Sequence, residues 1–141
     1  ITTIFGIVIP GSSPGGRAMD PKLEYIKSKD FGEFWLIVDR FYHGKFYTKE
    51  YPGLLANFLN KLRAKDVLDA ACGIGFPSLD LFKFGFNLTC SDGDSSMVEV
   101  FKLRAIEKKL NIPIICSKWA DLPKFFDNQF DAVLCLDSSI T

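Results

Sequence analysis

Two aspartates and two glycines form the strongest candidate for chemistry in this sequence. The segment 67–75 (VLDAACGIG) is an apolar run that reaches Asp69 and then passes into a turn with Gly73 and Gly75. Without side chains at these glycines, a ligand can lie directly against the backbone and the start of the next helix. Asp92 ends the next apolar run, where a carboxylate can accept hydrogen bonds from both ribose hydroxyls. The pattern indicates a site for a ribose-containing cofactor.

Each of these features also has a purely structural explanation. Any tight turn between a strand and a helix favours glycine, and Asp92 could be a turn or cap residue, a role for which Asp94 competes. A nicotinamide-binding turn has a third glycine three residues after the second, whereas this chain has Ser78 there, after Pro77. An NAD-dependent oxidoreductase is therefore kept as an alternative function. A catalytically silent cofactor-binding fragment, or an artificial chain, is the other.

The elements that must position these residues alternate along the chain. Apolar residues at helical spacing predict helices over 54–62, 79–84 and 97–110, and short apolar runs predict strands over 66–70, 86–90, 113–116 and 130–136. Gly85 is expected to end the second helix, and Asp94 or Ser95 to cap the third. Strands and helices in this order indicate right-handed crossovers and an α/β fold, a Rossmann-like doubly wound parallel sheet.

Composition and charge exclude several classes of partner. The 141 residues contain 17 Lys+Arg and 17 Asp+Glu, so the chain lacks the basic excess of a nucleic-acid backbone binder. The basic cluster Lys102, Arg104, Lys108 and Lys109 is interpreted as a solvated helix face. No run approaches the roughly 20 apolar residues of a membrane span. We expect a small-molecule substrate, no nucleic acid and no membrane partner, with a homo-oligomer left open. The 14 phenylalanines predict a well-filled apolar interior.

The four cysteines do not predict a metal site. Cys72, Cys90, Cys116 and Cys135 contain no C-x-x-C pair, so zinc is not expected. All four fall near the ends of predicted strands, where they are interpreted as small buried hydrophobic residues kept reduced in a cytoplasmic protein. Residues 1–20 combine an apolar stretch with a Gly/Ser/Pro-rich segment. They are interpreted as a leader or linker, either foreign or a native strand-like arm.

Taken together, the motifs resemble the class I S-adenosylmethionine-dependent methyltransferases. The segment 69–75 (DAACGIG) is similar to the first motif of that family, with Ala71 in place of its first glycine, as in glycine N-methyltransferase-like enzymes. The segments 48–51 (TKEY), 91–97 (SDGDSSM) and 130–136 (FDAVLCL) are similar to further motifs of the same enzymes. The resemblance covers roughly residues 48–139. It implies that residues 51–141 are an S-adenosylmethionine-binding domain and residues 21–50 a lid-like helical segment.

The resemblance also assigns the cofactor-binding residues. It places the methionine and sulfonium end of S-adenosylmethionine near Asp69, Ala71 and Gly73, within the turn that includes Gly75, and the ribose at Asp92. It places adenine between Met97 and Trp119, and Leu136 in the wall of the methyl-donor pocket. Lys118 departs from the family, because relatives have an acidic or amide acceptor there for the adenine amino group. A backbone carbonyl or Asp121 would have to replace that acceptor.

The methyl acceptor is expected to be a small molecule with a nucleophilic nitrogen or oxygen. The segment 137–140 (DSSI) follows the fourth strand and lacks the N/D-P-P-Y/F motif of relatives that methylate nucleobases. Asp137 could instead hold a cationic or hydroxylated acceptor, or be part of a solvated loop. Tyr47 and His43 are the other candidate catalytic residues, in an aromatic stretch that resembles the family's lid. Because the family's sheet has seven strands, the chain is expected to be truncated after the fourth.

Overall fold

The structure is a computed structural model that describes residues 50–127 and 130–136. The elements in chain order are α3 (Tyr51–Lys61), β1 (Asp66–Asp69), α4 (Ser78–Leu81), the 3-10 helix η1 (Phe82–Phe84), β2 (Asn87–Asp92), α5 (Ser95–Glu107), β3 (Ile114–Cys116), the 3-10 helix η2 (Trp119–Lys124) and β4 (Ala132–Leu134). Four strands thus alternate with helical segments, as the hydrophobic pattern predicts.

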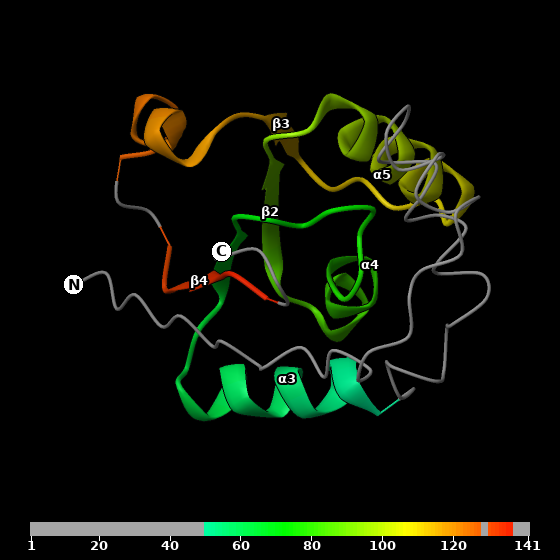
Figure 1. The fold of residues 1–141 in the computed structure, drawn as a ribbon. Helices are drawn as coiled ribbons and strands as arrows, with labels where there is room; N and C mark the ends of the chain where they lie inside the picture. The colour runs from blue at the N-terminus through cyan, green and yellow to red at the C-terminus, as the bar shows by residue number, and fades with distance from the viewer. Residues whose placement is uncertain (1–49, 128–129, 137–141) are drawn as a thin grey trace, which may run out of the picture.

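The four strands form one parallel sheet in the order β3-β2-β1-β4 (Figure 1). Asp69 lies opposite Cys90 of β2 and opposite Leu134 of β4, so β1 is paired on both sides. Before β4, the Asp131 carboxylate accepts hydrogen bonds from Lys65 N at 2.8 Å and Asp66 N at 3.0 Å, which ties the starts of β1 and β4 together. These pairings confirm the predicted parallel α/β sheet.

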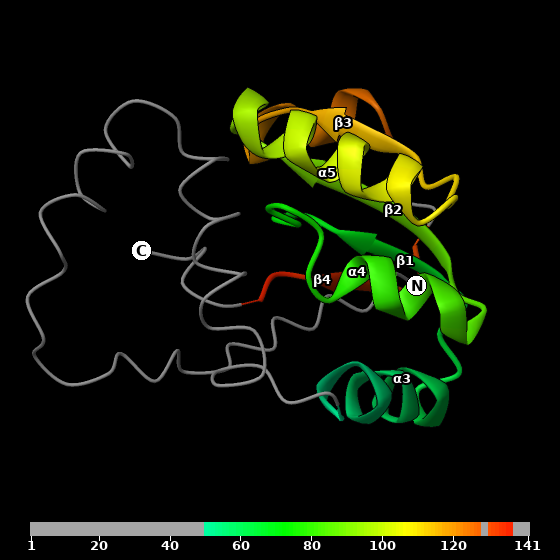
Figure 2. The ribbon, with the colours of Figure 1, turned by 90° about the vertical axis from the view of Figure 1, so that its right-hand side faces the viewer.

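The chain winds in two directions from β1. It moves through α4 to β2 and through α5 to β3, and then returns through η2 to β4 on the other side of β1. Right-handed crossovers that run in opposite directions place their helices on opposite faces of a sheet. Accordingly, α3, α4 and α5 cover one face (Figure 2), and the orange η2 segment lies across β3 from α5 (Figure 1). The strand order thus reverses beside β1, and open α/β sheets bind ligands outside the carboxyl ends of the strands at such a point.

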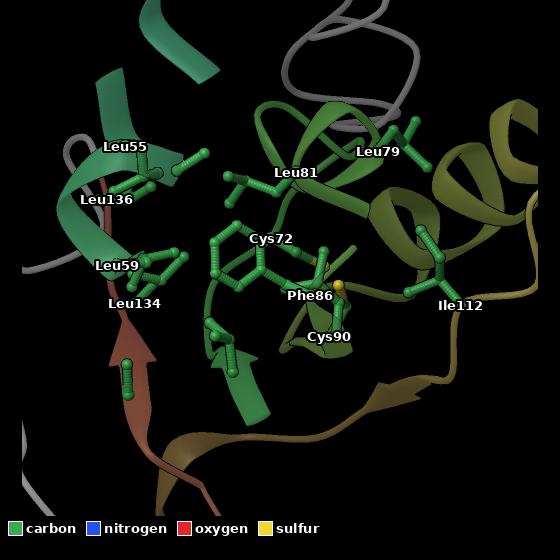
Figure 3. Packing of buried hydrophobic residues seen from close by; sticks show 14 of the residues in the cluster. Leu55, Leu59, Cys72, Leu79, Leu81, Phe86, Cys90, Ile112, Leu134 and Leu136 are labelled. Atoms are coloured by element: carbon green, nitrogen blue, oxygen red, sulfur yellow. The ribbon is translucent and has the colours of Figure 1, made fainter. Parts of the chain in front are cut away.

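The hydrophobic core lies between the sheet and the three α-helices. Leu55 and Leu59 of α3 face Leu134 and Leu136 (Figure 3). Phe101 of α5 is completely buried. Each buried side chain of this kind contributes about 1.5–3 kcal/mol relative to an exposed one.

The expectation of an interior filled by phenylalanine is only partly met. Phe86 and Phe101 are buried, whereas Phe84 and Phe125 are each 54% exposed. Phe84 is the last residue of the 3-10 helix η1, and Phe125 directly follows the 3-10 helix η2.

Two predicted helices differ in detail from their hydrophobic patterns. The helix after the glycine turn is one turn of α-helix followed by a 3-10 turn, and it ends at Gly85 with φ of +87°, as expected for a C-cap. In this helix, Leu79 N donates to Gly75 O and Leu81 N donates to Pro77 O. Neither of these two amides is therefore available as a donor to a ligand. In α5, Leu103 and Ile106 point away from the core and are 66% and 72% exposed.

Candidate functional site

The turn after β1 contains two glycines with different surroundings. Gly73 and Gly75 have φ angles of +52° and +103°, a region that favours glycine. A Cβ on Gly75 would lie 2.7 Å from Leu79 Cδ1 and 3.0 Å from Phe101 Cδ2, so Gly75 is required by packing. Among the described residues, a Cβ on Gly73 would meet no heavy atom within 4 Å. Gly73 therefore borders open space at the carboxyl edge of the sheet, where a ligand can approach the backbone.

Asp69 is a buried carboxylate at the end of β1, with 1% of its surface exposed. Ser78 Oγ donates a hydrogen bond to its Oδ2 at 2.5 Å, and Ala71 N donates to its Oδ1 at 3.3 Å. Burial raises the pKa of Asp69 from 3.8 to about 6, although these two hydrogen bonds lower it. The negative charge of Asp92 raises the pKa further. The carboxylate therefore has a charge that its surroundings solvate poorly.

Asp92 ends β2 and accepts two backbone hydrogen bonds. Gly73 N donates to Oδ2 and Asp94 N donates to Oδ1, both at 2.9 Å. The first of these bonds ties the glycine turn to β2, beside the bond from Cys72 N to Ser91 O at 3.0 Å. Because each carboxylate oxygen has two lone pairs, Asp92 can accept further donors. Asp92 therefore lies next to Gly73 and retains the acceptors that a ribose would need.

The N-cap of α5 is Asp94. Its Oδ1 accepts hydrogen bonds from Ser96 N at 2.8 Å, Met97 N at 3.2 Å and Ser96 Oγ at 2.6 Å. The Ser96 hydroxyl, with the two backbone bonds, lowers the pKa of Asp94. This arrangement decides between the two candidate caps, because Asp94 satisfies the first turn of α5 and Asp92 does not cap it.

Trp119 connects η2 to the end of β1. Its indole Nε1 donates a hydrogen bond to Ala70 O at 2.7 Å, across 49 residues of sequence. The ring stays 45% exposed, so one end of the side chain is fixed while much of the ring surface remains available for stacking. Trp119 is thus anchored beside the same turn as Asp69.

The remaining predicted site residues fall into two groups. Met97 and Leu136 are buried, with 6% and 7% exposure, and Leu136 belongs to the hydrophobic core near Leu55 (Figure 3). The other group lies outside the described residues: His43, Tyr47 and Asp137, the lid-like segment 21–49 and the leader 1–20. The structure thus brings Asp69, Ala71, Gly73 and Gly75 together with Asp92 and Trp119.

Two residues that bond to the turn or to Asp69 have roles that the sequence pattern does not predict. Ser78 stands out in the sequence only because it occupies the position of the third glycine, yet its hydroxyl donates a hydrogen bond to the buried Asp69. Arg104 was interpreted as part of a solvated basic face, but Arg104 Nη1 donates to Ile74 O at 3.0 Å. A hydroxyl in the first turn after a G-x-G sequence was the available signal for Ser78. The position of Arg104 depends on how α5 packs, which no local pattern reveals.

The cysteines divide by environment, and the expectation that all four are buried is wrong. Cys72 and Cys90 are buried, Cys135 is half-buried and Cys116 is exposed at the end of β3. The Cys90 thiol and burial hold the pKa of the Cys72 thiol well above its usual range. Residues 50–127 and 130–136 contain no group of three or more His, Cys, Asp or Glu side chains that could hold a metal ion. None of the helices in these ranges has the length and apolar character needed to cross a membrane.

A hollow of about 370 Å³ lies at the opposite edge of the sheet. Asp66 and Asn87, the first residues of β1 and β2, line it together with Phe126 and Phe130. Asn87 Nδ2 donates to Asp66 Oδ1 at 3.0 Å. The hollow is therefore separate from the turn that contains Gly73.

Comparison with known proteins connects this geometry to a family. Residues 67–141, just over half of the chain, match the family described as a methyltransferase domain. A glycine/sarcosine N-methyltransferase of Aphanothece halophytica is 37% identical over 78 residues, which are 55% of this chain and 29% of the relative. A glycine/sarcosine N-methyltransferase of Parasynechococcus marenigrum strain WH8102 is 30% identical over 118 residues, 84% of this chain and 40% of the relative.

A solved structure shares the fold. The crystal structure of an S-adenosylmethionine-dependent methyltransferase from Clostridium acetobutylicum ATCC 824 superposes with a TM-score of 0.60 at 22% identity. The match covers 77% of this chain and 44% of that one. The present chain therefore spans well under half of the length of each of these three proteins.

Proposed function

The chain belongs to the family of methyltransferase domains, and on this premise we propose that it binds S-adenosylmethionine at the carboxyl edge of β1 and β2. We further propose that it takes part in transfer of the methyl group to a nitrogen or oxygen of a small molecule. Residues 51–141 are the cofactor-binding domain in this proposal, and residues 21–50 a lid-like segment before it.

The open space beside Gly73 is the observation that carries the proposal. A Cβ at Gly73 would extend into this space without meeting another atom of residues 50–127 or 130–136 within 4 Å, and the Asp92 carboxylate lies against the Gly73 amide. The other glycine of the turn is explained by packing, whereas Gly73 is not. A bare backbone flanked by Asp69 and Asp92 fits a ligand that carries both a ribose and a cationic group.

Each part of the cofactor has residues that fit it. Asp92 would accept the ribose hydroxyls through its remaining lone pairs, and Asp69 would compensate positive charge at the methionine end near Ala71 and Gly73. The exposed surface of Trp119, with Met97 beneath the first turn of α5, would hold adenine on the side of β3. Leu136 would contribute to the wall of the methyl-donor pocket from the end of β4.

The chemistry that the protein must add is mainly alignment. When bound, S-adenosylmethionine supplies a methyl group on a sulfonium sulfur, and the departing thioether requires no proton. The Asp69 and Asp92 carboxylates orient the two polar ends of the ligand, which fixes the direction from which an acceptor approaches. Burial of Asp69 keeps water away from that charge and strengthens its interaction with a cation.

The acceptor side is proposed from residues outside the described ranges. Asp137 would contact a cationic or hydroxylated acceptor after β4, and Tyr47 and His43 are the remaining candidates for a base. The two curated relatives carry names that specify glycine and sarcosine, which favours a small amine. A cytoplasmic location and a homo-oligomeric assembly remain further proposals, and the formal net charge of zero argues against a nucleic-acid partner.

Thermal unfolding with added ligand tests the proposal. S-adenosylhomocysteine at about 100 times its dissociation constant should add about 2.7 kcal/mol to the free energy of unfolding. NAD at the same concentration should add nothing. Stabilisation by NAD alone would favour the oxidoreductase, and stabilisation by neither would favour a silent fragment.

Two glycines with matched geometry separate ligand binding from backbone strain. Gly73 and Gly85 both have positive φ, and a Cβ at either position would meet nothing within 4 Å. Gly73→Ala and Gly85→Ala should therefore cost similar stability. Only Gly73→Ala should weaken the binding of S-adenosylhomocysteine, because the methyl group of the introduced alanine occupies the ligand's place. The expected loss of affinity is about 100-fold, or about 2.7 kcal/mol of binding free energy. Equal affinities in the two variants would contradict the proposed location.

A further inference from the structure

We infer that Ser78 is a positioning residue of this site: its hydroxyl fixes the Asp69 carboxylate so that the carboxylate faces the cationic methionine end of the cofactor. The inference rests on the proposed function, because it assigns Ser78 a role toward the same ligand. Ser78 acts through Asp69 and does not itself contact the ligand.

The geometry of the pair favours this role. Ser78 is completely buried at the first residue of α4, and its Oγ lies 2.5 Å from Asp69 Oδ2. Ala71 N holds the other carboxylate oxygen from within the turn. Two donors on two different oxygens fix the rotation of the carboxylate.

The segment that carries Ser78 is itself held in place. Gly75 N donates to Cys72 O at 2.9 Å, and Leu79 N donates to Gly75 O at 2.9 Å. Gly75 also packs against Leu79 so closely that a Cβ would not fit. The hydroxyl is therefore presented to Asp69 from a rigid support, which is what a positioning residue requires.

In the part of the chain that the structure describes, the groups around Asp69 leave its charge uncompensated. Asp92 of β2 has the same sign and disfavours ionisation of Asp69. The Cys72 thiol in the turn and the Cys135 thiol after β4 both have raised pKa values, to which the Asp69 charge contributes, so they remain neutral. Arg104 of α5 donates to Ile74 O. Hydrogen bonds from Ser78 and Ala71 therefore support the ionised form until a cationic ligand arrives.

The first test follows Asp69 itself and needs no cofactor. NMR titration of the Asp69 side-chain carboxyl in the full chain should give a pKa near 6. Ser78→Ala should raise it by about one unit, because a hydrogen bond to the charged form is lost. Ser78→Cys, a weaker donor of similar size, should give an intermediate value. Ser96→Ala is the matched control, because it removes the same kind of hydroxyl from Asp94 and should leave Asp69 unchanged.

The second test measures S-adenosylhomocysteine binding from pH 5 to 8 by calorimetry. Affinity should fall up to tenfold per pH unit once Asp69 protonates. The midpoint of this fall should move to higher pH in Ser78→Ala and stay in place in Ser96→Ala. A merely structural role for Ser78 would instead weaken binding equally at every pH. Asp69→Asn should remove the step altogether, with or without Ser78→Ala.

The outcomes separate the inference from the proposed function. An unmoved Asp69 titration in Ser78→Ala, or a binding midpoint that does not move, would overturn the inference while S-adenosylhomocysteine still binds. No binding to the wild-type chain at any pH would overturn the proposed function, and the assigned role of Ser78 with it. The inference is supported if the midpoints of the Asp69 titration and of the binding curve both move to higher pH, in the order Ser78, Ser78→Cys, Ser78→Ala.

Discussion

Asp69 at the end of β1 and Asp94 after β2 each accept a hydrogen bond from a serine hydroxyl, yet the pKa values of the two carboxyl groups shift in opposite directions. Asp94 accepts three hydrogen bonds from Ser96 and Met97, and its pKa is lowered. Asp69 accepts one bond from Ser78 and one from Ala71, and its pKa is raised to about 6.

Burial explains this difference. Asp69 is 1% exposed, and desolvation is the largest cause of its shift, whereas the half-buried Asp94 keeps part of its hydration. The second turn uses its aspartate to begin a helix. The first turn maintains an ionisable group at a cost in stability, and such perturbed groups concentrate at functional sites.

The largest effect should come from the glycine that packs the first turn. Gly75→Ala places a Cβ 2.7 Å from Leu79 Cδ1 at a φ of +103°, and crowding and backbone strain together should cost about 4 kcal/mol. The control is Gly93→Ala in the second turn, where the nearest atom is Ser117 O at 3.9 Å. Urea denaturation should show a far smaller loss for this control. Similar losses would mean that the two turns are equally crowded.

Removal of the buried charge should stabilise the protein. Above pH 7, Asp69→Asn should raise the free energy of unfolding by about 2 kcal/mol. Removal of the charge should add about 3 kcal/mol, because the pKa is about 6 in the folded state against 3.8. The loss of one hydrogen bond should subtract about 1 kcal/mol. Because the pKa is raised in the folded state, wild-type stability falls as pH rises from about 4 to 6. The advantage of Asp69→Asn should therefore vanish near pH 4. Denaturation curves between pH 4 and 8 measure it, and a gain that is constant with pH would contradict the assignment.

The opposite sign is expected at the second turn. Asp94→Ala removes the N-cap of α5 and should destabilise the chain by about 1 kcal/mol at pH 7. Because the pKa of Asp94 is lowered in the folded state, this loss should shrink as the pH falls below the usual range of a carboxyl group. Thermal unfolding at pH 7 and pH 3 checks both statements. An increase in stability at pH 7 would remove the contrast with Asp69.

The smallest effect should come from the link between η2 and the first turn. Trp119→Phe keeps an aromatic ring and loses the hydrogen bond from Nε1 to Ala70 O, which should cost about 0.5–1 kcal/mol. The midpoint of urea denaturation measures this loss of stability. The control is Phe125→Leu, which changes an exposed ring in the same region. No change in Trp119→Phe would show that the turn does not depend on this bond.

The sequence allowed the fold and the centre of the site to be predicted because the signals are local. The alternation of apolar periods identified the strands, and the glycine turn with Asp69 and Asp92 identified the carboxyl edge. Gly85 was predicted as a C-cap and either Asp94 or Ser95 as the N-cap of α5, since caps depend on residues within one turn; the structure selects Asp94. The hydroxyl of Ser78 in the first turn after the glycines is visible in the sequence, but its partner Asp69 is not, because that contact depends on how a single helical turn packs against β1.

Exposure was predicted less well than element type. Leu103 and Ile106 fit the apolar spacing of α5 and are nevertheless exposed, because a short sheet covers only one side of a helix. Cys116 was expected to be buried at a strand end, but β3 is at the edge of the described sheet and leaves it exposed. Burial depends on neighbours that are distant in the sequence.

The return of the chain to β4 also affects the order in which the sheet can assemble. Val67 pairs with Leu88, 21 residues later, and with Ala132, 65 residues later. Loop-closure entropy makes the second pairing more costly by about 1 kcal/mol. Contacts between β1, β2 and β3 are thus favoured early in folding, and β4 docks onto a surface that already exists. The reversal of strand order beside β1 is completed only at that step, so ligand-binding competence should appear late in refolding, after most of the helical signal.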